Sequence, residues 1–208
     1  MSNALKRKRK PMEPVGFTKK EIAETKDAMA RLNNTAELMG EAFLNVRLIA
    51  YQILHDKFGF GKKRITKVDE TIDKYIQKAA AGRVTEKELM FLLKEKYNID
   101  VKAEANKVPF RERFAITKRK FEFKSKQSAG MYILASICNY FALLGTCLKT
   151  QFKFSKRQIE KVYFHIRDYI NTLSRFKEFE LKIEHIAESV AEECKFIDKR
   201  FAGGSNGA

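Results

Sequence analysis

The sequence predicts an all-α protein: a helical bundle of two related three-helix units, with one further helix before the first unit. Apolar residues recur at the spacing of amphipathic helices, and no segment alternates convincingly in the manner of a strand. The 208 residues include only 10 glycines and 3 prolines, too few for most turn-rich β folds. A hydrophobic share of 44% is enough for a core and excludes a wholly disordered chain.

An internal repeat supports the division into two units. At a shift of 94 residues, the segment 58–65 (FGFGKKRI) lies over 152–159 (FKFSKRQI). The match continues without a gap to Ile76 and Ile170, and upstream it sets Asn45 on Asn139. We interpret this match as a duplicated unit. The alternative is coincidence between two lysine-rich amphipathic helices.

The elements follow in order from local patterns. Residues 1–17 form a flexible basic arm. A further helix over about 18–33 precedes the three helices of the first unit, and together they span 18–104. Gly82 closes a helix that starts near Lys62, and Thr85 with Glu88 forms a capping box that opens the next. A basic connector spans 105–127, where a short hairpin is possible within 107–123. The second unit spans 128–201, with helices near 128–151, 155–174 and 178–200, and 202–208 is a flexible tail. The last helix directs a set of apolar side chains inward: Ile183, Ile186, Ala187, Val190, Cys194 and Ile197.

A stretch without charges occupies residues 128–148 and is long enough to cross a membrane. Its repeat partner, 36–57, is amphipathic and carries Glu37, Glu41, Arg47 and Asp56. Because a soluble twin implies a soluble fold, we expect a buried central helix, with a membrane span and a dimer interface as alternatives. Cys138 and Cys147 then behave as small core residues.

The charge of the chain favours anionic partners. Lys and Arg number 42 against 26 Asp and Glu, a net charge of +16, which points first to nucleic acid. The basic run in the arm is a solvated terminus, a phosphate-binding arm or a nuclear-import-like signal; its residues are Lys6, Arg7, Lys8, Arg9 and Lys10.

Several predicted helix starts carry cations, which the positive end of a helix dipole repels by about 0.3–1 kcal/mol each. Free backbone N–H groups together with such cations would make an anion pocket, although lysine is abundant enough to fall there by chance. The cations at these starts are Lys19 and Lys20, then Lys62, Lys63 and Arg64, and then Lys156 and Arg157. Ser155 with Gln158 still forms a plausible capping box.

The connector carries eight cations against two acidic residues, interleaved with Phe110, Phe114, Phe121 and Phe123. Such alternation suits a nucleic-acid groove, in which cations neutralise phosphates and rings stack on bases; equally, the rings could anchor the connector to the core. The candidate phosphate contacts here are Arg111, Arg113, Lys118, Arg119 and Lys120.

Features of enzymes and metal sites are weak. Residues 59–63 (GFGKK) lack the spacing of a phosphate loop, and the three histidines and three cysteines show no ligand spacing. Asp69 and Asp73 are an acidic pair that could touch a metal, but the second unit has Tyr163 and Arg167 at those positions. We therefore expect no enzyme, no metal and no cofactor, and His165 as a packed or half-exposed residue.

The segment 55–64 (HDKFGFGKKR) resembles one in small helical proteins of phages and prophages from low-GC Gram-positive bacteria. The resemblance covers at most residues 40–100 and names no activity. It implies a mobile-element accessory protein in a bacterial cytoplasm.

Taken together, the sequence predicts a non-enzymatic protein that binds DNA or RNA mainly through phosphates. The alternative is a phage-type inhibitor that binds a host nucleoprotein machine, such as a CRISPR effector or a polymerase, by protein contacts. No membrane partner is expected, and a homodimer is possible.

Overall fold

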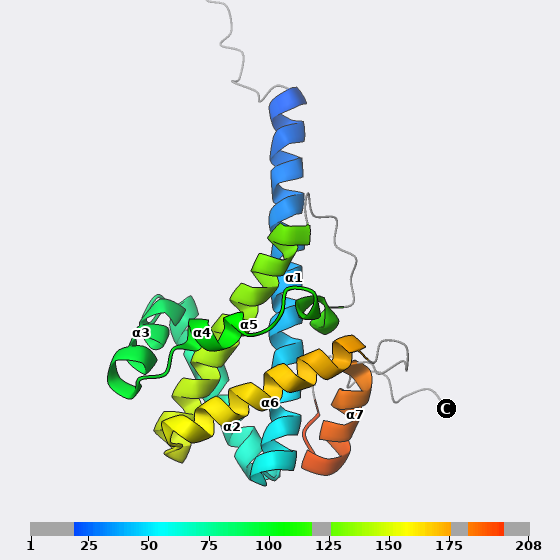
Figure 1. Cartoon of the computed structure of the whole chain (residues 1–208). Coiled ribbons are helices and arrows are strands. Elements are labelled where there is room, and N and C mark those ends of the chain that lie inside the picture. The colour runs from blue at the N-terminus through cyan, green and yellow to red at the C-terminus, as the bar shows by residue number, and fades with distance from the viewer. Residues whose placement is uncertain (1–18, 118–125, 176–182, 198–208) are drawn as a thin grey trace, which may run out of the picture.

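The computed structural model describes residues 19–117, 126–175 and 183–197, with side chains from residue 27 onward. Every regular element in these ranges is helical, which confirms the all-α prediction (Figure 1). The 3₁₀ helix η1 stands where a hairpin was considered, and no strand occurs in the described part of the connector. The elements are α1 (Lys19–Phe58), α2 (Lys62–Ala80), α3 (Glu86–Tyr97), α4 (Val101–Asn106), η1 (Glu112–Ile116), α5 (Lys126–Phe152), α6 (Lys156–Arg175) and α7 (Ile183–Cys194).

The helices differ from the predictions in three places. The helices expected at 18–33 and 36–57 are one continuous helix, α1, because no glycine or proline interrupts the backbone between them. α7 ends at Cys194, where Lys195 adopts a left-handed φ of 52°, so Ile197 lies beyond the helix and is 64% exposed rather than inward. The short helix α4 was not predicted; Asp100 caps it by accepting a hydrogen bond from the Ala103 N–H at 2.9 Å.

The predicted repeat has a matching backbone. α1 ends at Phe58 and α5 at Phe152, and α2 and α6 then begin at Lys62 and Lys156, each pair 94 residues apart. The loops also share a hydrogen bond: the Phe60 N–H donates to the Leu54 carbonyl at 3.0 Å, and the Phe154 N–H to the Leu148 carbonyl at 3.1 Å. The alignment of the two segments therefore describes two copies of one helix–loop–helix.

The two copies are intertwined and share one core. α1 packs along α5, whereas α2 packs against α5 and α6 against α1, so each copy's second helix lies on the first helix of the other copy. The third helices are exchanged in the same way, with α3 on α5 and α7 on α1. The units that the repeat defines in sequence are thus halves of a single body related by a pseudo-two-fold axis.

α5 is the central helix of this body. It is long and apolar enough to cross a membrane, but most of its most apolar stretch is buried inside the protein, as expected for the core helix of a soluble protein. Cys147, on its buried face, is a free thiol whose pKa burial raises to about 12. It behaves as the small core residue that the sequence predicted.

Matched positions of the two copies carry different chemistry. In the first copy, Arg47 forms an ion pair with Asp69 and a second one with Asp73 at 2.9 Å. In the second copy, Phe141 and Tyr163 hold the positions of Arg47 and Asp69, and their rings stack with centroids 4.3 Å apart. Because one guanidinium bridges both carboxylates, the acidic pair considered as a metal contact is an intramolecular ion-pair set.

The N-terminal part of α1 stands out from the bundle (Figure 1). α1 begins 13 residues earlier than the repeat of α5 requires, since Lys126 matches Leu32. Residues 27–33 are exposed, including Met29 and Leu32. At a rise of about 1.5 Å per residue, the 40 residues of α1 span about 60 Å.

Candidate nucleic-acid interface

The pseudo-two-fold axis brings the two basic helix starts together. The loops that precede α2 and α6 meet through four phenylalanines, of which Phe58 contacts Phe154 and Phe60 contacts Phe152, with ring centroids 5.8 and 5.0 Å apart. These two contacts are exchanged by the axis, and Phe60 meets its own repeat partner Phe154 at 5.9 Å. The two loops therefore lie side by side at the lower end of the molecule in Figure 1.

Cations surround this aromatic centre. We call the set the paired-loop surface, and all its members are exposed: Lys57, Lys62, Lys63, Arg64, Lys153, Lys156, Arg157 and Lys161. Arg64 lies over the Phe60 ring, with 5.4 Å from its guanidinium carbon to the ring centroid. Lys156 has a partner, Glu160, at 3.6 Å. The surface has a concentrated positive charge, and its long side chains end in solvent.

The two helix starts are capped differently. Ser155 and Gln158 form the predicted capping box: the Ser155 N–H donates to Gln158 Oε1 at 2.8 Å, and the Gln158 N–H donates to Ser155 Oγ at 3.3 Å. Gly61 has no side chain and provides no such bond for the first turn of α2. The Arg64 N–H already donates to the Gly61 carbonyl at 3.0 Å, so only the N–H groups of Lys62 and Lys63 are left for the anion that the sequence-based hypothesis places at such a helix start.

Lys153 occupies a backbone conformation that favours glycine. Its φ is 57°, and its repeat partner Gly59 has a φ of 65°. A residue with a side chain costs about 1–2 kcal/mol in this left-handed region. Glycine fits the same turn in the other copy, so local stability does not account for a lysine at this exposed position.

The pKa of His165 is affected by cations from both copies. The pKa of His165 is lowered below its ordinary value by partial burial and then by the charges of Lys161 and Lys57. Lys57 comes from the end of α1 and Lys161 from α6, so these two cations approach one imidazole from different halves of the protein. His165 itself packs edge-on to Phe58, with ring centroids 6.4 Å apart, as the predicted packed histidine.

Not every predicted contact residue belongs to this surface. Lys19 and Lys20 lie in the first turn of α1, at the opposite end of the longest helix. Arg111 is exposed beside η1. The predicted residues Lys6, Arg7, Lys8, Arg9, Lys10, Lys118, Arg119 and Lys120 lie outside the described residues.

Arg113 departs from its predicted role. Its side chain is buried, with only 8% of the residue exposed, and its guanidinium donates to the carbonyls of Val108 and Gly130 at 3.2 and 3.4 Å. Its position among backbone carbonyls satisfies these acceptors inside the protein. Arg113 therefore braces η1 against α5, and the prediction that it contacts phosphate is corrected.

The described phenylalanines of the connector differ in how far they are anchored. Phe114 packs against the core, and Phe110 meets it edge-on with centroids 5.5 Å apart. Phe110 also covers Gly130, where an added Cβ would lie 2.3 Å from the ring. Of the two roles considered for these rings, anchoring is the one that Phe114 has, whereas Phe110 contacts Phe114 and Gly130 but remains 40% exposed, so base stacking by Phe110 stays a prediction. Phe121 and Phe123 lie outside the described residues.

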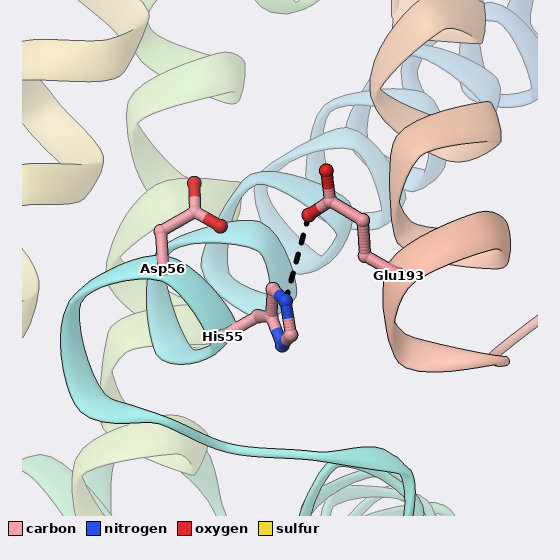
Figure 2. A group of neighbouring side chains, drawn as sticks. All are labelled: His55, Asp56 and Glu193. Carbon is pink, nitrogen blue, oxygen red and sulfur yellow. Dashed lines mark ion pairs between the residues drawn. The ribbon is translucent and has the colours of Figure 1, made fainter.

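A polar cluster lies next to the loops and was missed in the sequence. Figure 2 shows His55 and Asp56 at the end of α1 facing Glu193 of α7, with His55 Nε2 3.5 Å from Glu193 Oε2. One potential ligand atom from each residue lies within 4.8 Å of the others. Glu193 is 137 positions away from Asp56, and no spacing rule connects residues so distant in the chain.

Hydrogen bonds inside this cluster make a polar contact between helices. Gln52 Nε2 donates to Asp56 at 2.9 Å and to Glu193 at 3.2 Å, so an N–H group already points at both carboxylates. His55 Nδ1 lies 3.1 Å from the Phe60 carbonyl, to which it donates its proton. The cluster thereby ties α7 to the end of α1 and fixes the loop that carries Phe60.

The paired-loop surface thus combines two segments that are distant in the sequence. The sequence analysis predicted the cations at the start of each helix. Lys57, Lys153 and Lys161 were not predicted; the repeat pairs Lys153 with Gly59, which is the only sequence feature that marks its turn. Comparisons with protein-family models, curated proteins and solved structures find no match to this chain.

Proposed function

We propose that this protein binds nucleic acid without catalysis, through phosphate contacts at the paired-loop surface. The observation that carries the proposal is the meeting of two basic helix starts around one aromatic centre. A site assembled from two copies of a loop presents its cations in pairs, and a duplex or folded RNA presents phosphates in rows. Lys153 adds support as an exposed cation of this surface, in a turn whose other copy has Gly59.

Electrostatic binding of this kind predicts a strong dependence on salt. On duplex DNA, log K falls by about 0.9 per phosphate contacted for each unit of log salt. The matching experiment titrates the full chain with labelled duplex DNA and structured RNA at several salt concentrations. We expect steep lines for the wild type and no preference for a particular base sequence, because phosphate contacts carry no sequence information.

A charge-reversed variant locates the contacts. Changing Lys62, Lys63, Lys156 and Arg157 to Glu should remove most of the affinity and flatten the salt dependence. The matched control reverses four exposed cations distant from the loops, Arg83, Lys87, Lys102 and Lys126, with the same change in net charge. Equal losses in both variants would mean that net charge alone drives binding. Absence of any wild-type binding at low salt would reject nucleic acid as the partner.

A second candidate function is a phage-type inhibitor that binds a host nucleoprotein complex. It is favoured by an uncovered apolar groove between α1, α2 and α5, which a purely phosphate-binding protein does not need. In that case the paired-loop surface would occupy a channel meant for nucleic acid. We also propose that the protein is a mobile-element accessory protein that acts in a bacterial cytoplasm. This proposal rests only on the resemblance of the segment 55–64.

A further inference from the structure

The groove breaks the symmetry of the two halves. It encloses about 590 Å³, within the range of about 300–1,000 Å³ typical of ligand-binding clefts. Its walls come from α1, α2 and α5, and its edge is formed by the start of α3. Apolar side chains dominate the lining, which includes Phe43, Leu44, Ile76, Ala79 and Leu143, together with the amide of Asn139. Ile76 remains 38% exposed there.

The corresponding groove of the other half is filled by the chain itself. Exchange of the two copies converts α1, α2 and α5 into α5, α6 and α1, and η1 packs against these three helices. Ile116, the last residue of η1, is fully buried, and its carbonyl accepts a hydrogen bond from Asn45 Nδ2 at 2.9 Å. η1 is therefore an example of the kind of segment that can bind in such a groove.

Asn139 is the repeat partner of Asn45 and lines the uncovered groove. Within the described part of the chain, its amide has no hydrogen-bond partner. The two grooves thus share an amide at the same position, and only in the filled groove does a backbone carbonyl satisfy it. An amide beside apolar walls prefers such a carbonyl, because an unpaired polar group loses stability when it is covered.

The course of the chain explains why one groove is uncovered. The repeat sets Arg113–Ile116 against Lys19–Ile22, which form the first turn of α1. In the second half the chain folds back over the groove before α5 begins. In the first half the matching residues continue straight along the protruding end of α1 and leave the groove without its cover.

We propose that this groove binds a short apolar turn of a partner protein, in the way that η1 fills the symmetry-related groove. The partner segment places an aliphatic side chain between Ile76 and Leu143 and offers a backbone carbonyl to Asn139. It needs no acidic anchor, because the nearby Arg47 already pairs with two carboxylates. The proposal is independent of nucleic-acid binding, since the groove at Gly40 lies about 28 Å along α1 from the loop after Phe58.

Two occupants from this protein fit less well. Four extended residues reach only about 14 Å, so Val15 and Phe17 cannot enter the groove, which lies about 32 Å along α1 from Lys19. Leu5 lies 14 residues before Lys19, a reach of about 48 Å, and the removal of residues 1–17 described below tests it. A second copy could offer its η1 only by releasing it from its own groove, where Ile116 is fully buried.

The test selects ligands for the full chain from a phage-displayed library of random 12-residue peptides and measures the selected peptides, once synthesised, by calorimetry. A Gly40→Phe variant fills the groove, and since a Cβ at Gly40 meets no atom within 4 Å, the backbone need not move. An Asn139→Leu variant removes the amide. Each should weaken binding by about tenfold or more, equivalent to about 1.4 kcal/mol. The control Ile197→Ser changes an exposed apolar residue elsewhere and should leave binding unchanged.

Several results would overturn the proposal. These are a library that yields no peptide, or peptides that bind the wild type and Gly40→Phe equally. Peptide binding that appears only after removal of residues 1–17 would assign the groove to the arm. A dimer of the full chain in sedimentation that Gly40→Phe dissociates would assign it to a second copy. Circular dichroism confirms that each variant is folded before its binding is compared.

Discussion

A reciprocal exchange between Lys153 and Gly59 tests both the fold and the proposed interface. The two residues occupy matched left-handed positions, at φ values of 57° and 65°. Lys153→Gly relieves a conformational cost of about 1–2 kcal/mol. The greater conformational freedom that glycine gives the unfolded chain offsets about 0.5–1 kcal/mol of this stabilisation. The net expectation is an increase of about 1 kcal/mol in unfolding free energy.

The reverse change, Gly59→Lys, should lower the unfolding free energy by about the same amount. A Cβ at Gly59 would meet no atom within 4 Å, so its cost comes from the backbone conformation alone. For a chain of this length, 1 kcal/mol corresponds to about 2–4 °C in Tm. Urea denaturation followed by circular dichroism gives the free energies, and thermal melts give the order of the three proteins.

Affinity should move in the opposite direction from stability. Lys153→Gly removes one cation from the paired-loop surface and should reduce the salt slope by about one. Gly59→Lys adds one cation and should steepen the slope. Lys153→Asn is the control, because asparagine tolerates the left-handed region but carries no charge. A destabilised Lys153→Gly would refute the conformational reasoning, and unchanged affinity in Lys153→Asn would remove Lys153 from the interface.

Three further predictions concern stability. An added Cβ at Gly145 would lie 2.1 Å from the Tyr163 hydroxyl, so Gly145→Ala should cost about 1–3 kcal/mol in urea denaturation. Its cost should be smaller in a Tyr163→Phe background, which lacks that hydroxyl and its hydrogen bond to the Phe141 carbonyl; additive losses would contradict this packing. Burial opposes ionisation of Glu104, yet hydrogen bonds from Lys107 and Arg167 hold its pKa below the ordinary 4.5. The resulting stabilisation is complete above the ordinary pKa and lost as pH falls through the lower folded pKa, so Glu104→Gln should flatten the fall in Tm below about pH 5, whereas a parallel fall would count against it. Gln52→Leu, which removes the donor to Asp56 and Glu193, should cost about 1 kcal/mol, and Zn²⁺ should leave the wild-type Tm unchanged; a zinc-dependent rise that Glu193→Gln abolishes would identify a metal site instead.

Local patterns determined much of the fold because their causes are local. The capping box of Thr85 and Glu88 forms through bonds that span three residues, with the Thr85 N–H 2.7 Å from Glu88 Oε2. Gly82 closes α2 with a φ of 67°, a conformation that favours glycine. The helix break expected within α1 is absent, because weak helix formers such as Asn33 and Asn34 do not end a helix by themselves.

The sequence also determined that two similar basic loops exist, since the shift of 94 residues is visible without coordinates. Only the tertiary structure decided that Phe60 meets Phe154, which turns two loops into one surface. The burial of Arg113 belongs to the same class, because a guanidinium in a basic stretch is indistinguishable by pattern from its exposed neighbours. Helix caps and periodicity depend on residues a few positions apart, whereas the interface and the uncovered groove depend on how helices nearly a hundred residues apart pack.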